Sequence, residues 1–361
     1  MEKRLKIFYQ YSDKKIIQPI NGDFITELGI MTALSQFADV YYSGNKFNLD
    51  AKNYGMSNYI EDISSRVDNS YDIYYVRANK KVFLRIPKNK PKIWMAIPFD
   101  YECYSKATAI FVFTKAWEDS MKQDKCVMHD WIPEEHRIGW DKVITVHQVL
   151  GSHFVPLRNS EITQKIRKKI DSDFIIGYFG SMSGSNYPSV YLKTLTTLFK
   201  KYQNKKIKFF FGVKNAYIPG RKGVIKQEID YVDMPYWLSA CDLIIFSQSG
   251  FGANIAGSLK VLEAQACGVP ILLEDLKAKR ESLGDDYPFY MPPGSMSGEV
   301  TKSKKAMLVE KIDEIIYMYE EKKNDIRLIS KKIAQRSFYY KIEESIKRLK
   351  QIFEIIANGH N

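Results

Sequence analysis

The sequence predicts an α/β protein with two doubly wound parallel sheets, and three observations support this fold class. Short apolar runs alternate with amphipathic segments along the chain, which is typical of strand and helix units around a parallel sheet. The alternation starts afresh near residue 174, after a basic stretch at 156–173 that we expect to be weakly structured. The length of 361 residues is too great for one compact core. We therefore expect two Rossmann-like domains.

The first domain is expected at residues 1–155. Apolar or alternating runs bounded by loops predict its strands at 4–9, 39–44, 71–77, 92–99, 108–114 and 142–147. Between the first two strands, the pattern predicts a helix at 24–38. A strand, a helix and a further strand in this order are typical of the opening of a Rossmann-like domain.

The second domain is expected at residues 170–335. Its predicted strands are 174–181, 206–213, 242–249 and 269–275, and its predicted helices are 189–203, 234–241 and 258–268. The closing segment, 306–357, has apolar residues three and four positions apart and is predicted to be almost wholly helical.

Composition excludes several classes of protein. No run approaches the ~18 apolar residues of a membrane-spanning helix, and the N-terminal segment lacks the apolar core of a secretory signal. We therefore expect a cytoplasmic protein. Its four cysteines, Cys103, Cys126, Cys241 and Cys267, are far apart and are interpreted as free thiols. The five histidines show no metal-ligand spacing, so we expect no metal site.

The net charge of +12 is compatible with a polyanionic ligand such as a nucleotide diphosphate, or with an anionic membrane. The lysines of the second half lie mainly in solvated helix patterns and not among stacking aromatic residues, so we expect no nucleic-acid partner. A basic patch (Lys80, Lys81, Arg85, Lys88, Lys90 and Lys92) is interpreted as a solvated loop. The alternative is peripheral contact with an anionic membrane that carries a lipid-linked acceptor.

The most informative segment is 247–270. Gly250 and Gly252 follow a predicted strand and let the backbone approach a ligand closely, and a helix is expected to begin near 257 or 258. The helix start would bind a phosphate group, and Lys260 would add a charge. Glu263, one turn later, could accept hydrogen bonds from ribose hydroxyls. The alternative is a surface glutamate, which its apolar neighbours argue against.

The run at 260–272 resembles the signature of family 4 glycosyltransferases, which have the two-domain GT-B fold. The match consists of Glu263, Ala264, Ala266, Gly268 and Pro270. Other segments resemble the family in the expected order, and residues 336–361 resemble a terminal helix that packs on the N-terminal domain. The resemblance implies transfer of a hexosyl or pentosyl group, with retention, from a UDP- or GDP-linked sugar to a glycan, lipid-linked or protein-linked acceptor. The donor is a co-substrate, and no tightly bound cofactor is expected.

The resemblance and the glycine turns together indicate a set of donor-binding residues. The set comprises Gly180, Ser181, Ser183, Lys214, Arg221, Ser249, Gly250, Phe251, Gly252, Ala253, Asn254, Lys260 and Glu263. Two departures from the family pattern stand out. The position of the first glutamate of the usual pair is Ile255, and no cation follows Gly180. Hydroxyls, backbone amides, Lys214 or Arg221 would have to take the place of that cation.

In the first domain, the loop of Asn21, Gly22 and Asp23 lies between the first strand and its helix. Either its amides face the acceptor side of the site, or it is a plain turn in which Asp23 caps the helix. An inverting reaction needs a base, and Asp23 and Asp100 are the catalytic candidates because they follow predicted strands. Asp100 could equally be structural.

Two alternatives differ from the transferase interpretation. A sugar-nucleotide epimerase of the same architecture would share the donor site. A catalytically degenerate protein that has lost its first glutamate would bind the sugar nucleotide without turnover. A dehydrogenase is disfavoured because no strand is followed by the G-x-G-x-x-G pattern with an acidic residue beyond it.

Overall fold

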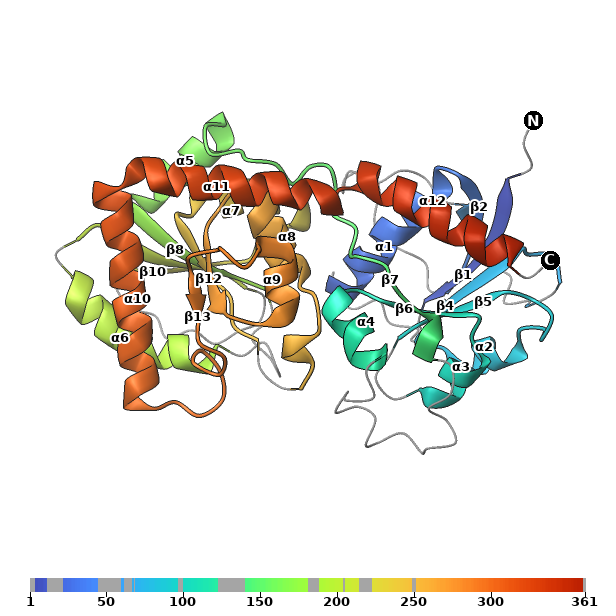
Figure 1. The fold of residues 1–361 in the computed structure, drawn as a ribbon. Coiled ribbons are helices and arrows are strands. Elements are labelled where there is room, and N and C mark those ends of the chain that lie inside the picture. The colour runs from blue at the N-terminus through green and yellow to red at the C-terminus, as the bar shows by residue number, and fades with distance from the viewer. Residues whose placement is uncertain are drawn as a thin grey trace. The chain divides into compact units, whose positions relative to one another are not determined.

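A computed structural model describes residues 4–11, 22–44, 60–61, 67, 69–96, 100–122, 140–180, 188–203, 205–213, 223–248 and 251–359. The chain divides into two compact units (Figure 1). The first consists of Met1–Ser152 and Tyr339–Asn361, and the second of His153–Phe338. No helix among the described residues is long and apolar enough to cross a membrane.

The first unit contains a parallel sheet of seven described strands in the order β3-β2-β1-β4-β5-β6-β7. The strands are β1 (Leu5–Tyr11), β2 (Ala38–Gly44), β3 (Ile60–Glu61), β4 (Ile73–Arg77), β5 (Lys92–Met95), β6 (Ala109–Val112) and β7 (Val143–Thr145). The side chains of Ile7, Phe8 and Tyr9 in β1 are almost fully buried because the strand lies inside the sheet.

Helices of the first unit come from both ends of the chain. They are α1 (Gly22–Ser35), α2 (Lys80–Arg85), α3 (Tyr101–Lys106), α4 (Lys115–Lys122), the short η4 (Trp140–Lys142) and α12 (Ile342–Asn358). The C-terminal α12 packs along α1, as Figure 1 shows. Its buried Phe353 places its ring 6.4 Å from that of Phe37 and 5.9 Å from that of Phe111.

The second unit contains a parallel sheet of six described strands in the order β10-β9-β8-β11-β12-β13. The strands are β8 (Phe174–Phe179), β9 (Ile207–Gly212), β10 (Val224–Gln227), β11 (Leu243–Ile245), β12 (Ile271–Glu274) and β13 (Tyr290–Met291). Every residue of β8 is buried, as expected for a strand of a parallel sheet that is covered on both faces.

Helices surround this second sheet (Figure 1). They are α5 (Glu161–Ile170), α6 (Ser189–Tyr202), η6 (Tyr231–Asp233), α7 (Met234–Ala240), η7 (Phe251–Asn254), α8 (Leu259–Ala266), α9 (Lys277–Leu283), α10 (Lys302–Glu321) and α11 (Lys323–Ser337). The short η8 (Phe338–Tyr340) follows α11.

The structure corrects two sequence predictions, a weakly structured stretch and a solvated loop. Residues 156–173 contain α5, which is capped by the Ser160 side chain and buries Ile166 and Ile170. Likewise, the basic patch is not simply a solvated loop, because it contains α2 and the start of β5. Lys92 is 7% exposed, with its ammonium 5.3 Å from the centre of the Phe83 ring. The patch therefore contributes part of its charge to the interior of the first unit.

Candidate functional site

The strand order of the second unit places a switch point between β8 and β11, because β9 and β10 lie to one side and β12 and β13 to the other. In doubly wound parallel sheets, ligands bind beyond the carboxyl ends of the strands at such a point. Gly180 follows the end of β8, and residues 246–248 follow the end of β11. The candidate site therefore belongs to this edge of the second sheet.

Gly180 and Lys260 meet at the end of β8. Gly180 has a φ of +97°, a conformation that favours glycine. A Cβ atom on Gly180 would lie 2.3 Å from Cε and 2.6 Å from Nζ of Lys260, so the lysine side chain passes directly beside this glycine. Burial lowers the pKa of the Lys260 ammonium, and the nearby Glu263 carboxylate opposes that effect. The structure thus brings together three residues that the sequence predicted for donor binding.

Glu263 lies one turn further along α8 and is 6% exposed. The hydroxyl of Tyr231 donates a hydrogen bond of 2.6 Å to its Oε1 atom. Burial raises the pKa of the Glu263 carboxyl to about 7, against the opposing effects of the Tyr231 hydrogen bond and the Lys260 charge. The carboxyl group is therefore a buried acid that changes its charge near neutral pH.

Lys279, on α9, was not singled out in the sequence. Its side chain is fully buried, and its Nζ atom donates to Gln248 Oε1 at 3.0 Å and to the Ala256 carbonyl at 2.7 Å. Burial lowers the pKa of the ammonium to about 7. Gln248 and Ala256 lie at opposite ends of residues 248–256, which we call the glycine-rich segment. Lys279 therefore links the two ends of this segment.

Asn254 and Ile255 have clear places in the same segment. The Asn254 Oδ1 atom accepts a hydrogen bond of 3.0 Å from the backbone amide of Lys277, the first residue of α9. Ile255, at the position of the expected first glutamate, is 9% exposed. Ala253 is also buried. A buried apolar side chain therefore occupies the position of the first glutamate in the family pattern that the sequence resembles.

Glu274 joins the end of β12 to the segment at 295–298. Its Oε1 atom accepts hydrogen bonds from the Met296 amide at 2.6 Å and from the Ser297 hydroxyl at 2.9 Å. The Ser247 hydroxyl donates to the Met296 carbonyl at 3.1 Å. The ends of β11 and β12 are thus connected to one loop at the carboxyl edge of the sheet, a link that the sequence did not indicate.

In the first unit, a buried polar cluster lies between α1 and the neighbouring strands β1 and β4. The fully buried Glu27 accepts hydrogen bonds from the hydroxyls of Tyr9 and Tyr75, and it forms an ion pair with Arg77. Burial holds the pKa of both tyrosines well above the usual range, and the negative charge of Glu27 raises it further. Arg77 closes this cluster at the carboxyl end of β4.

The predicted catalytic residues are described only in part. Asp100 precedes α3, and its Oδ1 atom lies 3.5 Å from Nζ of Lys80. Gly22 and Asp23 begin α1, but the Asp23 side chain is outside the described structure. The backbones of Phe251 and Gly252 lie in η7. The other predicted residues outside the described ranges are Asn21, Ser181, Ser183, Lys214, Arg221, Ser249 and Gly250.

No family model and no curated protein matches this chain. Solved structures do. A glycosyltransferase from Rickettsia africae has a TM-score of 0.69 and 13% identity, with 98% of each chain covered. HepE from Anabaena, in complex with UDP and glucose, has a TM-score of 0.66 and 12% identity, with 97% of this chain and 99% of that chain covered. A putative UDP-N-acetylglucosamine 2-epimerase from Listeria monocytogenes has a TM-score of 0.56 and 11% identity, with 98% and 96% covered.

These matches extend over nearly the whole chain, and at this identity they show its fold. The chain has the α/β architecture of two Rossmann-like units found in GT-B glycosyltransferases, which confirms the predicted fold class. Among the described residues, no group of three or more histidine, cysteine or acidic side chains could hold a metal ion.

Proposed function

We propose that this protein is a glycosyltransferase that moves a sugar from a nucleotide-diphosphate donor to a hydroxyl group of a glycan or glycolipid acceptor. The observation that carries the proposal is the meeting of the Gly180 turn, Lys260 and Glu263 at the switch point of the second sheet. The similarity to HepE in complex with UDP and glucose, and to a Rickettsia glycosyltransferase, supports it.

The donor would bind at the carboxyl edge of the second sheet. The diphosphate would accept hydrogen bonds from the backbone at the Gly180 turn and from the first turn of α8, with the Lys260 ammonium balancing its charge. Tyr231 holds the Oε1 atom of Glu263, so we assign Oε2 to the ribose hydroxyls. Lys279 would keep the glycine-rich segment in place through its bonds to Gln248 and Ala256.

Catalysis would rest on orientation and on stabilisation of the leaving diphosphate. Negative charge develops on the diphosphate as the sugar departs, and donors fixed before the reaction stabilise that charge without reorganising. We propose a retaining reaction with a UDP- or GDP-linked hexose or pentose. If the reaction instead inverts, Asp23 or Asp100 would take the proton of the acceptor hydroxyl.

A product assay tests this proposal. The full chain is incubated with radiolabelled UDP-glucose or GDP-mannose and a panel of glycan and glycolipid acceptors, and the products are separated by chromatography. We expect label in the acceptor with wild-type protein, and about a hundredfold less with Lys260→Ala, as is typical when a donor to a developing charge is removed. The control variant Lys302→Ala, an exposed lysine in the first turn of α10, should keep full activity.

An epimerase is the second candidate, because the putative epimerase from Listeria matches over 98% of this chain. The same assay separates the two. An epimerase would convert the nucleotide sugar into an isomer without any acceptor, whereas a transferase would release the nucleoside diphosphate. Donor binding without either product would favour a catalytically degenerate sugar-nucleotide-binding protein.

A further inference from the structure

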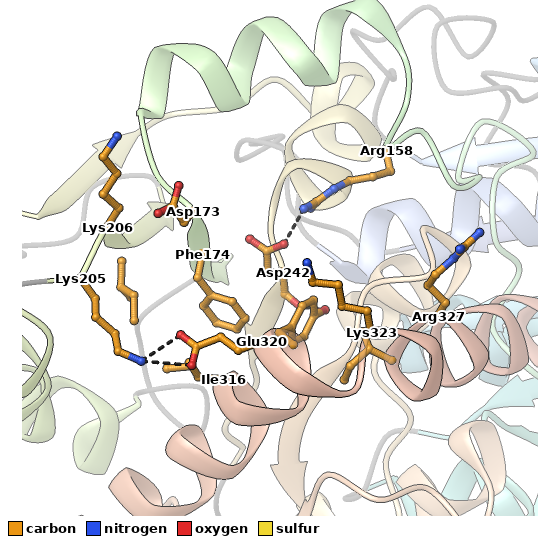
Figure 2. A pocket seen from close by; sticks show the side chains of 13 residues that line it. Arg158, Asp173, Phe174, Lys205, Lys206, Asp242, Ile316, Glu320, Lys323 and Arg327 are labelled. Atoms are coloured by element: carbon orange, nitrogen blue, oxygen red, sulfur yellow. Dashed lines mark hydrogen bonds and ion pairs between the residues drawn. The ribbon is translucent and has the colours of Figure 1, made fainter.

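A cavity lies at the opposite edge of the second sheet from the candidate donor site. It has a volume of about 860 Å³ and includes residues at the amino ends of three strands: Phe174 of β8, Ile207 of β9 and Asp242 just before β11. Helices α10 and α11 form the other wall, as Figure 2 shows. Because the strands are parallel, this edge is distinct from the carboxyl edge where Gly180 and Lys260 meet.

Four lining side chains form an apolar surface in the cavity. Phe174, Ile207, Ile316 and Ile326 are each more than nine-tenths buried and come from both walls. The ring of Tyr319 packs edge-on against that of Phe174, with 4.9 Å between the ring centres. This part of the cavity would favour an apolar group over water.

Two of the three acidic lining residues, Asp242 and Glu320, are already neutralised, whereas the exposed Asp173 has no ion pair among the described residues. Asp242, 4% exposed at its side chain, forms ion pairs with Arg158 at 2.5 Å and with Arg167 at 3.0 Å, and it also accepts from the Ile175 amide. Glu320 pairs with Lys205 at 2.9 Å. Neither carboxylate therefore needs a further cation from the cavity wall.

Two basic side chains of the cavity wall differ from the others, because no acidic partner in the described part of the chain balances their charge. Lys323 and Arg327, both exposed and one helical turn apart on α11, have no ion pair among the residues that the structure describes. Like charges at this spacing repel each other and destabilise a helix slightly. In Figure 2, Lys323 extends to the side of the cavity that holds the Arg158–Asp242 pair, whereas Arg327 extends outward. The lining contains five basic and three acidic residues, an excess of two positive charges.

We propose that this cavity is a binding site for an amphiphilic phosphate, a phosphate group joined to an apolar body. The phosphate binds Lys323 at the rim, where Arg327, one helical turn further along α11, adds positive charge, and the apolar body lies against Phe174, Ile207 and Ile316. The proposal does not depend on the proposed transferase function, because none of the lining residues belongs to the donor site.

Isothermal titration of the full chain with octyl phosphate and with inorganic phosphate tests the proposal. Octyl phosphate should bind the wild-type protein, and inorganic phosphate should bind at least tenfold more weakly because it lacks the apolar body. The double variant Lys323→Ala/Arg327→Ala should weaken octyl phosphate binding about tenfold or more, since the contact with Lys323 and the positive charge of Arg327 are both lost.

The matched control is Lys302→Ala/Lys331→Ala, which removes two exposed lysines outside the cavity. Lys302 is the first residue of α10, just as Lys323 is the first residue of α11. Its affinity for octyl phosphate should equal that of the wild type. Equal affinities in the two double variants would overturn the assignment of the cations, and equal affinities for the two ligands in the wild type would overturn the assignment of the apolar surface.

Discussion

Glu263 makes a quantitative prediction about stability and pH. Its carboxyl group has a pKa of about 7 in the folded chain, against a usual value of 4.5. The folded state therefore binds a proton that the unfolded state has lost between these two values, and stability falls as pH rises through this window. At 1.36 kcal/mol per pKa unit, the whole window corresponds to about 3 kcal/mol.

The test compares the wild type with Glu263→Gln, in which this site stays neutral. Between pH 5 and pH 8 the wild type should lose about 2 to 3 kcal/mol more stability than the variant, because most of the window lies in this range. Urea unfolding of both proteins at both pH values measures the difference, and titrations common to both proteins cancel. If the stability of both proteins depended on pH in the same way, the assignment of Glu263 as a buried acid with a raised pKa would be refuted.

Three other test substitutions, one with a matched control, have expected outcomes. Gly180→Ala should lower the unfolding free energy in urea by about 1–3 kcal/mol and should lower nucleotide affinity, because the added Cβ meets the Lys260 side chain. The matched control is Gly223→Ala, where φ is also positive, at +93°, but nothing lies within 4 Å of the added Cβ. The control should lose stability through backbone strain alone and keep the nucleotide affinity of the wild type. Lys279, whose pKa is lowered to about 7, should make the wild type gain stability from pH 7 to pH 10, and Lys279→Met should abolish that gain in melting curves. Asp242→Asn should cost about 3 kcal/mol or more of unfolding free energy, since it leaves two arginines without their partner, and an unchanged urea midpoint would contradict this.

The sheets could be predicted from the sequence because their strands are continuous apolar runs. The fully buried run of β8 and the glycine after it identified both the strand and the edge where ligands bind. The stretch containing α5 was expected to be weakly structured because half of the residues in that helix are charged, although Ile166 and Ile170, one turn apart, could have indicated a packed helix.

The side chains that hold the candidate site in place through hydrogen bonds could not be predicted from the sequence. Tyr231 bonds to a carboxylate 32 positions away, and no local pattern indicates such a partner. Lys279 lies in a short polar helix, where a lysine is normally solvated, and its partners Gln248 and Ala256 lie 31 and 23 positions away in the sequence. Lys260 and Glu263 could be singled out because they share one helix with a local motif.

Nucleotide binding at the carboxyl edge of the second sheet is the central claim, and isothermal titration of the full chain with UDP and GDP tests it most directly. One of the two nucleotides should bind the wild type and Lys302→Ala equally, and should bind Lys260→Ala and Glu263→Ala at least tenfold more weakly because contacts to the diphosphate and the ribose are lost. Unchanged affinity in both site variants, or no binding of either nucleotide to folded wild-type protein, would contradict the claim.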